Sequence, residues 1–191
     1  MYILVGLGNP GEEYENTRHN TGRLTVQAYC QANKFENFVE DGKTNSLRLE
    51  GKIGKNKITC LLPETFMNKS GSAVKKLVTS KKKAEKLIVF HDDLDLAIGR
   101  FKISFGKGSG GHKGVESVMR AVKTKDFWRV RIGICPITSK GKTKKLPRRS
   151  SGQVKGEAVL DFLMGKFKPT ETTILKKVNK EIDKRLEQII K

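Results

Sequence analysis

Hydrophobic residues along this chain follow two patterns that alternate: short continuous runs and residues spaced three to four apart. Short apolar runs rich in Val, Ile, Leu and Phe predict β-strands. These runs lie at residues 2–5, 46–50, 57–62, 86–90, 100–105 and 128–134. Apolar residues at helical spacing predict helices around residues 24–29, 73–78 and 115–122. A further helix is expected from about residue 170, where Pro169 and Thr170 supply a start and one apolar face continues to Ile190.

Strands that alternate with helices predict an α/β fold, with a twisted and largely parallel sheet flanked by helices. The two runs between residues 46 and 62 are joined through Gly51 and Gly54, which predicts an antiparallel hairpin and therefore a mixed sheet. A length of 191 residues without a repeat suits a single domain over residues 1–191. Residues 138–151 combine Lys and Arg with Gly, Pro and Ser and lack apolar periodicity, which predicts a mobile basic loop.

The charge of the chain indicates a polyanionic partner. Lys and Arg number 39 against 20 Asp and Glu, a formal net charge of +19. Nucleic acid is the usual partner of such an excess, and a lysine-rich solubilising surface is the alternative. The three cysteines are far apart in sequence, which favours core-filling roles in a reducing cytoplasm over a disulfide framework. We expect no signal peptide and no membrane span, because no apolar stretch approaches the required length.

A glycine-rich loop follows the first predicted strand directly. It runs from Gly6 to Gly11 and is followed by Tyr14 and then by His19, which lies between an arginine and an asparagine. Active sites of open α/β sheets lie beyond the carboxyl ends of their strands. A histidine placed there among hydrogen-bond donors is a candidate catalytic residue.

The same loop also spells G-x-G-x-x-G, the pattern of dinucleotide-binding loops. In that fold a helix opens at the third glycine, and an acidic residue about 20 positions on binds the ribose. Here a polar run follows Gly11, and residues 31–33 contain no acid. Pro10 also removes an N–H that a phosphate would need. The sequence therefore disfavours a nicotinamide or flavin cofactor.

All three histidines lie at or beside predicted element ends. His91 follows a predicted strand and precedes Asp92, and His112 follows the glycine run at 106–111. A structural role is the default for any one of them, but three at loop junctions favour a site. The zinc spacings H-x-x-x-H and C-x-x-C are missing, so we expect no metal and no cofactor. The nucleophile pattern G-x-S-x-G is also missing around Ser109.

These exclusions leave histidine as a general base acting on water. A carboxylate would hold its tautomer, and Asn9, Asn20 and Asn68 could supply amides for the oxyanion. Such machinery suits an activated acyl ester better than an amide. Phe66 and Met67 precede Asn68 and either fill the core or line an apolar groove for a base or a peptide side chain.

Taken together, these blocks resemble the bacterial-type peptidyl-tRNA hydrolases. The matching blocks are GLGNPG at 6–11, TRHN at 17–20, TFMNKSG at 65–71, HDDLD at 91–95 and GGH at 110–112. They stand in the family's order and spacing. The resemblance covers residues 2 to about 133 and continues more weakly through 152–168.

The resemblance implies cleavage of the ester between a peptide and the 3′ ribose of tRNA, which recycles tRNA after abortive translation. It implies a monomer with no metal. His19 would accept a proton from water, Asp92 would hold and polarise His19, and Asn9 would read the acylated nitrogen and help reject free aminoacyl-tRNA. The other expected substrate contacts are Tyr14, Phe66, Met67, Asn68 and Lys113. The expected tRNA backbone contacts are Lys102 and Arg131 from the resemblance, and Lys142, Lys144, Lys145 and Arg148 from the basic loop.

Two positions depart from the family. Lys113 stands where the family has an asparagine that positions the water or the oxyanion. A lysine donates hydrogen bonds but accepts none, and it would lower the pKa of a nearby His19. Ser104 stands where many members have a tRNA-binding lysine, which the basic loop would replace. Lys113 therefore keeps open an alternative, an RNA-binding protein on the same scaffold with weakened catalysis, whereas the retained His19 and Asp92 favour the esterase.

Overall fold

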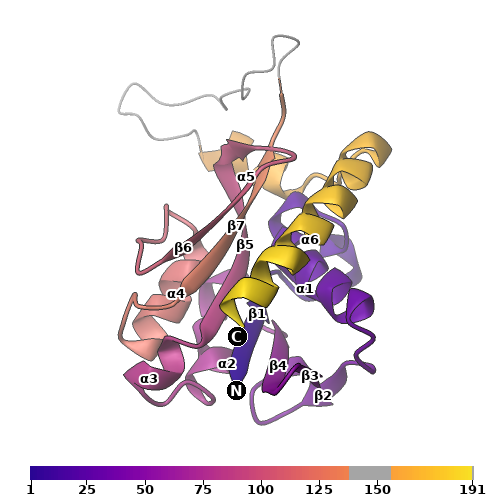
Figure 1. The fold of residues 1–191 in the computed structure, drawn as a ribbon. Coiled ribbons are helices and arrows are strands. Elements are labelled where there is room, and N and C mark those ends of the chain that lie inside the picture. The colour runs from indigo at the N-terminus through magenta and orange to yellow at the C-terminus, as the bar shows by residue number, and fades with distance from the viewer. Residues whose placement is uncertain (138–155, 191) are drawn as a thin grey trace.

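A twisted seven-stranded sheet lies at the centre of this computed structural model, which describes residues 1–137 and 156–190 (Figure 1). The strands are β1 (Tyr2–Gly6), β2 (Val39–Asp41), β3 (Ser46–Ile53), β4 (Asn56–Pro63), β5 (Leu87–Ala97), β6 (Phe101–Phe105) and β7 (Trp128–Cys135). Their order is β2-β3-β4-β1-β5-β7-β6. The four central strands β4, β1, β5 and β7 are parallel, and the outer pairings are antiparallel. The predicted α/β class with a mixed, largely parallel sheet is confirmed.

Helices cover both faces of the sheet. They are α1 (Thr21–Ala32), α2 (Gly71–Lys75), α3 (Lys81–Ala84), α4 (Lys113–Val122), α5 (Gly156–Met164) and α6 (Pro169–Ile189), with short 3-10 turns η1 (Glu12–Tyr14), η2 (Arg18–Asn20) and η3 (Met67–Lys69). Neighbouring strand residues point to opposite faces. Leu4 therefore packs with α1 and α6 in one core cluster, and Ile3 packs with α2 and α4 in the other. The two helical layers stand on either side of the sheet in Figure 1.

The register of the central strands places the candidate residues at one edge of the sheet. Gly6 at the end of β1 lies beside Phe90 of β5, and the Leu7 N–H donates to the Phe90 carbonyl at 3.1 Å. Helix α1 crosses this point very closely, because a Cβ at Gly22 would lie 2.1 Å from the Phe90 oxygen. Only glycine allows this approach, which holds η2 and His19 near the carboxyl end of β1 and the middle of β5.

Several boundaries differ from the prediction. Strand β5 does not end at residue 90 but continues to Ala97, because it pairs with β7 through Asp93 and again at Ala97 after a register shift. His91 therefore lies inside a strand, and its predicted place at an element end was wrong. The helix predicted at 73–78 ends at Lys75. Helices α3 and α5 and strand β2 were not predicted.

The hairpin, the C-terminal helix and the buried cysteines agree with the prediction. Strands β3 and β4 form the predicted hairpin, with its turn at Gly54, where φ is +56°. Helix α6 begins at Pro169 as predicted. All three cysteines are buried. Within the described residues, none of the helices is long and apolar enough to cross a membrane. The predicted basic loop at 138–151 lies outside the described residues.

Candidate active site

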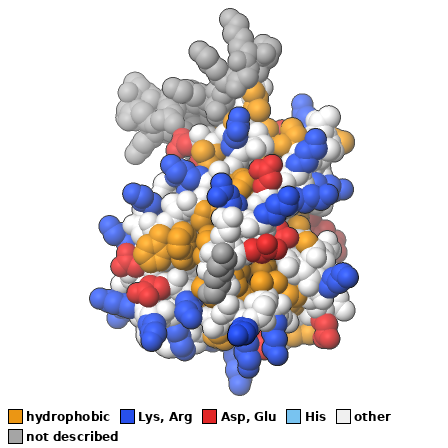
Figure 2. Space-filling view, in the orientation of Figure 1, with side chains coloured by type: hydrophobic (Ala, Val, Ile, Leu, Met, Phe, Trp, Pro, Cys, Tyr) orange, Lys and Arg blue, Asp and Glu red, His pale blue; other side chains and the backbone are white. Residues whose placement is uncertain are grey.

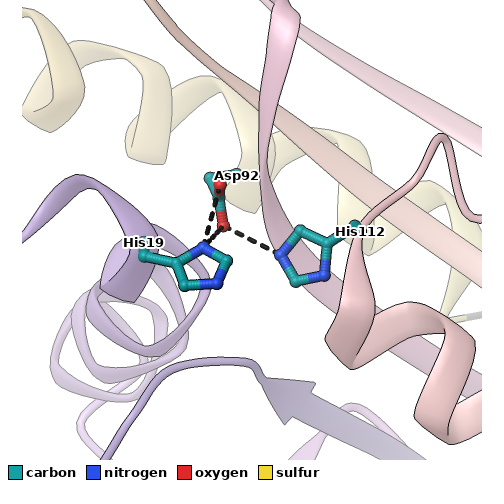
Figure 3. Close-up of side chains that lie close together, drawn as sticks. All are labelled: His19, Asp92 and His112. Atoms are coloured by element: carbon teal, nitrogen blue, oxygen red, sulfur yellow. Dashed lines mark hydrogen bonds and ion pairs between the residues drawn. The ribbon is translucent and has the colours of Figure 1, made fainter. Parts of the chain in front are cut away.

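One carboxylate is shared by two histidines just beyond the carboxyl end of β1 (Figure 3). Asp92 comes from β5, His19 from η2, and His112 caps the N-terminus of α4. Asp92 Oδ1 lies 3.0 Å from His19 Nδ1 and 2.9 Å from His112 Nε2. Three segments that are distant in sequence therefore converge on one oxygen atom.

The hydrogen bonds determine which nitrogens carry protons. His112 Nδ1 accepts the backbone N–H groups of Gly114 and Val115 at 3.1 and 3.3 Å, so its proton is on Nε2 and points at Asp92. His91 donates from Nδ1 to the Asp92 carbonyl at 2.8 Å, and its ring centre lies 4.8 Å from that of His112. His112 is thus locked as a donor to Asp92, a role for which the residues around it in sequence gave no signal beyond its position after the glycine run.

His19 is arranged to accept a proton. Its Nδ1 faces Asp92, so that the carboxylate fixes a tautomer with Nε2 unprotonated. Burial lowers the pKa of His19, but the charge of Asp92 and its hydrogen bond outweigh burial, so the net shift is above 6.5. The positive charge of Lys113 acts in the opposite direction and lowers the pKa of His19, as predicted. Asp92 therefore makes His19 a stronger base, and the charge of Lys113 limits this increase in pKa.

Asp92 stays ionised although it is buried. Its side chain is 3% exposed, and burial alone would raise its pKa. The two histidines that share its oxygen outweigh burial and hold the pKa of Asp92 well below its usual range. A negative charge therefore lies next to His19.

Asn9 is held so that one amide group is left to act. Its Oδ1 accepts the Met67 N–H at 2.8 Å, which leaves its Nδ2 as a donor. Among the described residues, no acceptor lies within hydrogen-bond distance of that Nδ2. Asn20 does not supply an oxyanion amide, as the sequence suggested: its side chain exchanges two hydrogen bonds, 2.8 and 2.9 Å, with the backbone of Asn9 and is 3% exposed. Asn20 therefore holds the loop, and Asn9 keeps a donor without a partner among the described residues.

The segment around η3 divides into core and surface residues. Met67 is 5% exposed and packs its sulfur against Gly114, where a Cβ would lie 2.5 Å away. For Met67 the structure favours the core alternative, with its backbone N–H orienting Asn9. Phe66 is 58% exposed, Asn68 is exposed, and Tyr14 on η1 is half-buried. The exposed Phe66 ring is available for stacking.

Arg18 ties the turn that carries His19 to the C-terminal helices. Its guanidinium forms an ion pair with Glu171 of α6 at 2.9 Å and stacks on Phe162 of α5 with 4.6 Å to the ring centre. Its backbone N–H donates to the Gly165 carbonyl at 3.0 Å. The residue before His19 is thus buried against α5 and α6, and these contacts hold α5 beside the turn that carries His19.

A cavity of about 590 Å³ opens beside the histidines. Its polar side includes His19, Asp92 and His112. Its apolar side is formed by Val159, Leu160 and Leu163 of α5. Sequence analysis missed this wall, although the spacing of the three apolar residues on one helical face is the signal that would have found it.

The predicted basic contacts lie in different surroundings. Lys102 and Arg131 are opposite each other on β6 and β7. Lys113 is exposed at the first turn of α4 and lines the cavity. On the face seen in Figure 2, Lys and Arg side chains are spread over both flanks and do not gather over one element. The four basic residues expected in the loop, Lys142, Lys144, Lys145 and Arg148, lie outside the described residues.

Known proteins are similar to this chain in sequence and in fold. The peptidyl-tRNA hydrolase family model matches residues 3–191. The peptidyl-tRNA hydrolase of Campylobacter jejuni strain RM1221 is 37% identical over an alignment of 192 residues, which covers 100% of this chain and 91% of that protein. That of Thermodesulfovibrio yellowstonii is 44% identical over 137 residues, covering 70% and 72%. A crystal structure of the Acinetobacter baumannii enzyme has a TM-score of 0.81 at 27% identity and covers 100% of this chain and 88% of that one.

Proposed function

The chain belongs to the peptidyl-tRNA hydrolase family and hydrolyses the ester bond of peptidyl-tRNA, and we propose that His19 is the general base of this reaction, with Asp92 as its partner. The observation that carries the proposal is the 3.0 Å contact between His19 Nδ1 and an Asp92 carboxylate that stays ionised. The family and this pair together disfavour the alternative of an RNA-binding protein with weakened catalysis.

In the proposed reaction His19 Nε2 removes a proton from a water molecule, and the resulting hydroxide attacks the ester carbonyl. The carbonyl oxygen becomes an oxyanion, and the ribose 3′ oxygen then leaves as the carbonyl re-forms. The imidazolium returns its proton to that leaving oxygen. Asp92 stabilises the imidazolium and keeps Nδ1 protonated throughout. The products are the peptide carboxylic acid, which loses its proton to solvent, and free tRNA.

We propose that this chemistry proceeds without a metal. The three potential ligand atoms, on His19, Asp92 and His112, lie within 4.8 Å of one another. His112 cannot offer an unprotonated Nε2, because its Nδ1 already accepts two N–H groups of α4. The set is therefore organised as a hydrogen-bond network around Asp92, and water activation by His19 needs no Lewis acid.

Substrate selection is proposed to depend on Asn9. Since its Oδ1 is occupied by the Met67 N–H, the group that remains is the donor Nδ2. A donor suits the carbonyl oxygen of the acyl group on the first amino acid, which peptidyl-tRNA has and free aminoacyl-tRNA lacks. The ammonium of the free substrate would instead face a donor of like polarity. Tyr14, Phe66 and Asn68 are proposed to hold the 3′ end of the tRNA, with the exposed Phe66 ring as a stacking surface.

The tRNA backbone is proposed to bind basic side chains, with the enzyme acting as a cytoplasmic monomer. The proposed contacts are Lys102, Arg131, Lys142, Lys144, Lys145 and Arg148. Phosphate contacts position a nucleic acid without reading its sequence. Replacing the last four by serine should weaken all tRNA species alike and lower the salt slope of binding by about one unit per lost contact. If the salt slope of tRNA binding did not change, these four side chains would serve solubility and would not contact tRNA.

The assay for the catalytic proposal is release of the acyl group from N-acetyl-aminoacyl-tRNA. His19→Ala should lower the rate by about 10²–10⁴-fold. Its tRNA affinity should stay close to that of the parent protein, because the imidazole acts on water. Parent-like turnover by this variant contradicts the assignment of His19 as the base.

A second comparison tests Asn9 with the same assay. The parent protein should prefer the N-acetylated substrate over free aminoacyl-tRNA, and Asn9→Ala should reduce that preference. Asn9→Asp is the matched control, because it keeps an acceptor for the Met67 N–H and removes the Nδ2 donor. Undiminished preference in both variants would show that another group reads the acylated nitrogen.

A further inference from the structure

Asp93 follows the catalytic Asp92 in β5 but faces different partners. Its Oδ2 accepts the Arg131 Nε–H at 2.5 Å, and its Oδ1 accepts the Asp95 N–H at 2.8 Å. The side chain is 9% exposed. Both carboxylate oxygens are therefore engaged, and the orientation of the group is fixed by its own strand.

Arg131 stands in a row of residues that crosses three strands. It lies opposite His91 on β5 and opposite Lys102 on β6. The Lys102 side chain is exposed, and that of Arg131 is 26% exposed. Two cationic residues thus lie opposite each other on β6 and β7, and Asp93 on β5 bonds the arginine.

The bond to Asp93 uses only one edge of the guanidinium. Arginine has five N–H donors in a planar fork, and Asp93 takes the one on Nε. Among the described residues, neither Nη atom of Arg131 has a hydrogen-bond acceptor. A guanidinium held through Nε presents its two Nη groups together, the geometry that binds two oxygens of a phosphate.

We propose that Asp93 is a positioning residue for substrate binding: it holds the Arg131 guanidinium so that the Nη groups and the Lys102 ammonium face one phosphate of the tRNA backbone. This inference rests on the proposed function, in which Lys102 and Arg131 contact that backbone. An arginine side chain has large rotamer freedom, and binding must otherwise restrict it at a cost in affinity. Asp93 restricts it before the substrate arrives.

The opposing effect is repulsion, because Asp93 is itself negative and lies near the proposed phosphate. Low exposure and the direct bond to Arg131 limit this effect. The two effects predict opposite changes in tRNA affinity when Asp93 is removed. Positioning predicts that loss of Asp93 weakens tRNA binding, whereas repulsion or competition for Arg131 predicts that it tightens binding.

The test compares Asp93→Ala, Asp93→Asn and Arg131→Ala on N-acetyl-aminoacyl-tRNA. Asp93→Ala should raise KM roughly tenfold and change kcat by less than about twofold. Asp93→Asn should be milder, since its amide oxygen still accepts a bond from Nε. Glu116→Gln is the charge control, because it removes an exposed carboxylate on α4 and should leave KM within about twofold.

A double variant isolates the coupling. Because Asp93 is proposed to act only through Arg131, Asp93→Ala should have no further effect on KM in the Arg131→Ala background. Tighter tRNA binding in both Asp93 variants, or equal effects with and without Arg131, overturns the inference. So does a fall in kcat in both Asp93 variants, which would mean that the change acts on Asp92 next to it.

Arg131→Ala separates this inference from the function it rests on. It should lower the salt slope of tRNA binding by about one unit. An unchanged slope shows that Arg131 meets no phosphate, and the proposed contact itself then fails. A reduced slope combined with an unaltered KM in Asp93→Ala refutes the positioning role alone.

Discussion

A buried, uncharged histidine should make this fold sensitive to acid. His91 is 3% exposed, and its Nε2 is buried without a hydrogen-bond partner in the described part of the chain. Burial first, and then the charges of His112 and Arg131, lower the pKa of His91 from 6.5 to about 3, although Asp92 acts in the opposite direction. The perturbation is a lowering of pH, compared between the parent protein and His91→Asn.

The magnitude follows from the difference between folded and unfolded pKa values. Below pH 6.5 the unfolded chain binds a proton at His91 that the folded protein does not, so stability falls as pH falls. The contribution is fully present above pH 6.5 and is lost progressively down to about pH 3. One pH unit corresponds to about 1.4 kcal/mol, so about 2 kcal/mol is lost by pH 5 and about 5 kcal/mol in total. Typical domains have only about 5–15 kcal/mol of stability.

His19 and Asp92 do not contribute to the loss of stability between pH 6 and 4.5. The pKa of His19 is raised, so its stabilisation is complete below pH 6.5 and is lost only as pH rises through its folded value. The pKa of Asp92 is lowered from 3.8, so its stabilisation is lost only at pH values below that. Between pH 6 and 4.5 the difference between the two proteins therefore reports His91.

The assay is urea unfolding followed by the fluorescence of Trp128, the single tryptophan, at pH 7, 6, 5 and 4.5. Asparagine does not titrate and keeps a donor near the Nδ1 position. Between pH 6.5 and 5 the parent protein should lose about 2 kcal/mol more than His91→Asn. His19→Asn, which removes a different histidine, should retain the acid sensitivity. Equal losses in the parent protein and His91→Asn would refute the reasoning.

The remaining predictions concern rate and packing. Because His19 must be neutral to act and its pKa is raised, the acid limb of kcat/KM should lie above pH 6.5. Lys113→Asn should keep or raise activity at alkaline pH. It should also move the acid limb of kcat/KM to higher pH, because it removes a charge that lowers the pKa of His19, and an unchanged acid limb would contradict this. Gly22→Ala should lower Tm, because its Cβ would lie 2.1 Å from the Phe90 oxygen, whereas Gly42→Ala, with nothing within 4 Å, should not.

The sequence by itself determined the parts of this protein that depend on neighbours along the chain. A continuous apolar run located β1, which is buried on both faces, and apolar residues spaced three to four apart located α4 and α6, which each bury one face. The glycine loop and the motif blocks identified the family, and they singled out His19 and Asp92 from a set of many polar residues.

Only the tertiary structure decided which polar groups meet. His112 and His19 share one oxygen of Asp92 across separations of 20 and 73 residues, and the order and register of the strands set that contact. The pleat of β5 likewise turns Asp92 to the histidines and Asp93 to Arg131, although the two carboxylates are chemically identical in sequence. Asn20 was mistaken for a catalytic amide for the same reason. Its partner is the backbone of Asn9, and a hydrogen bond to backbone cannot be read from which side chains the sequence contains.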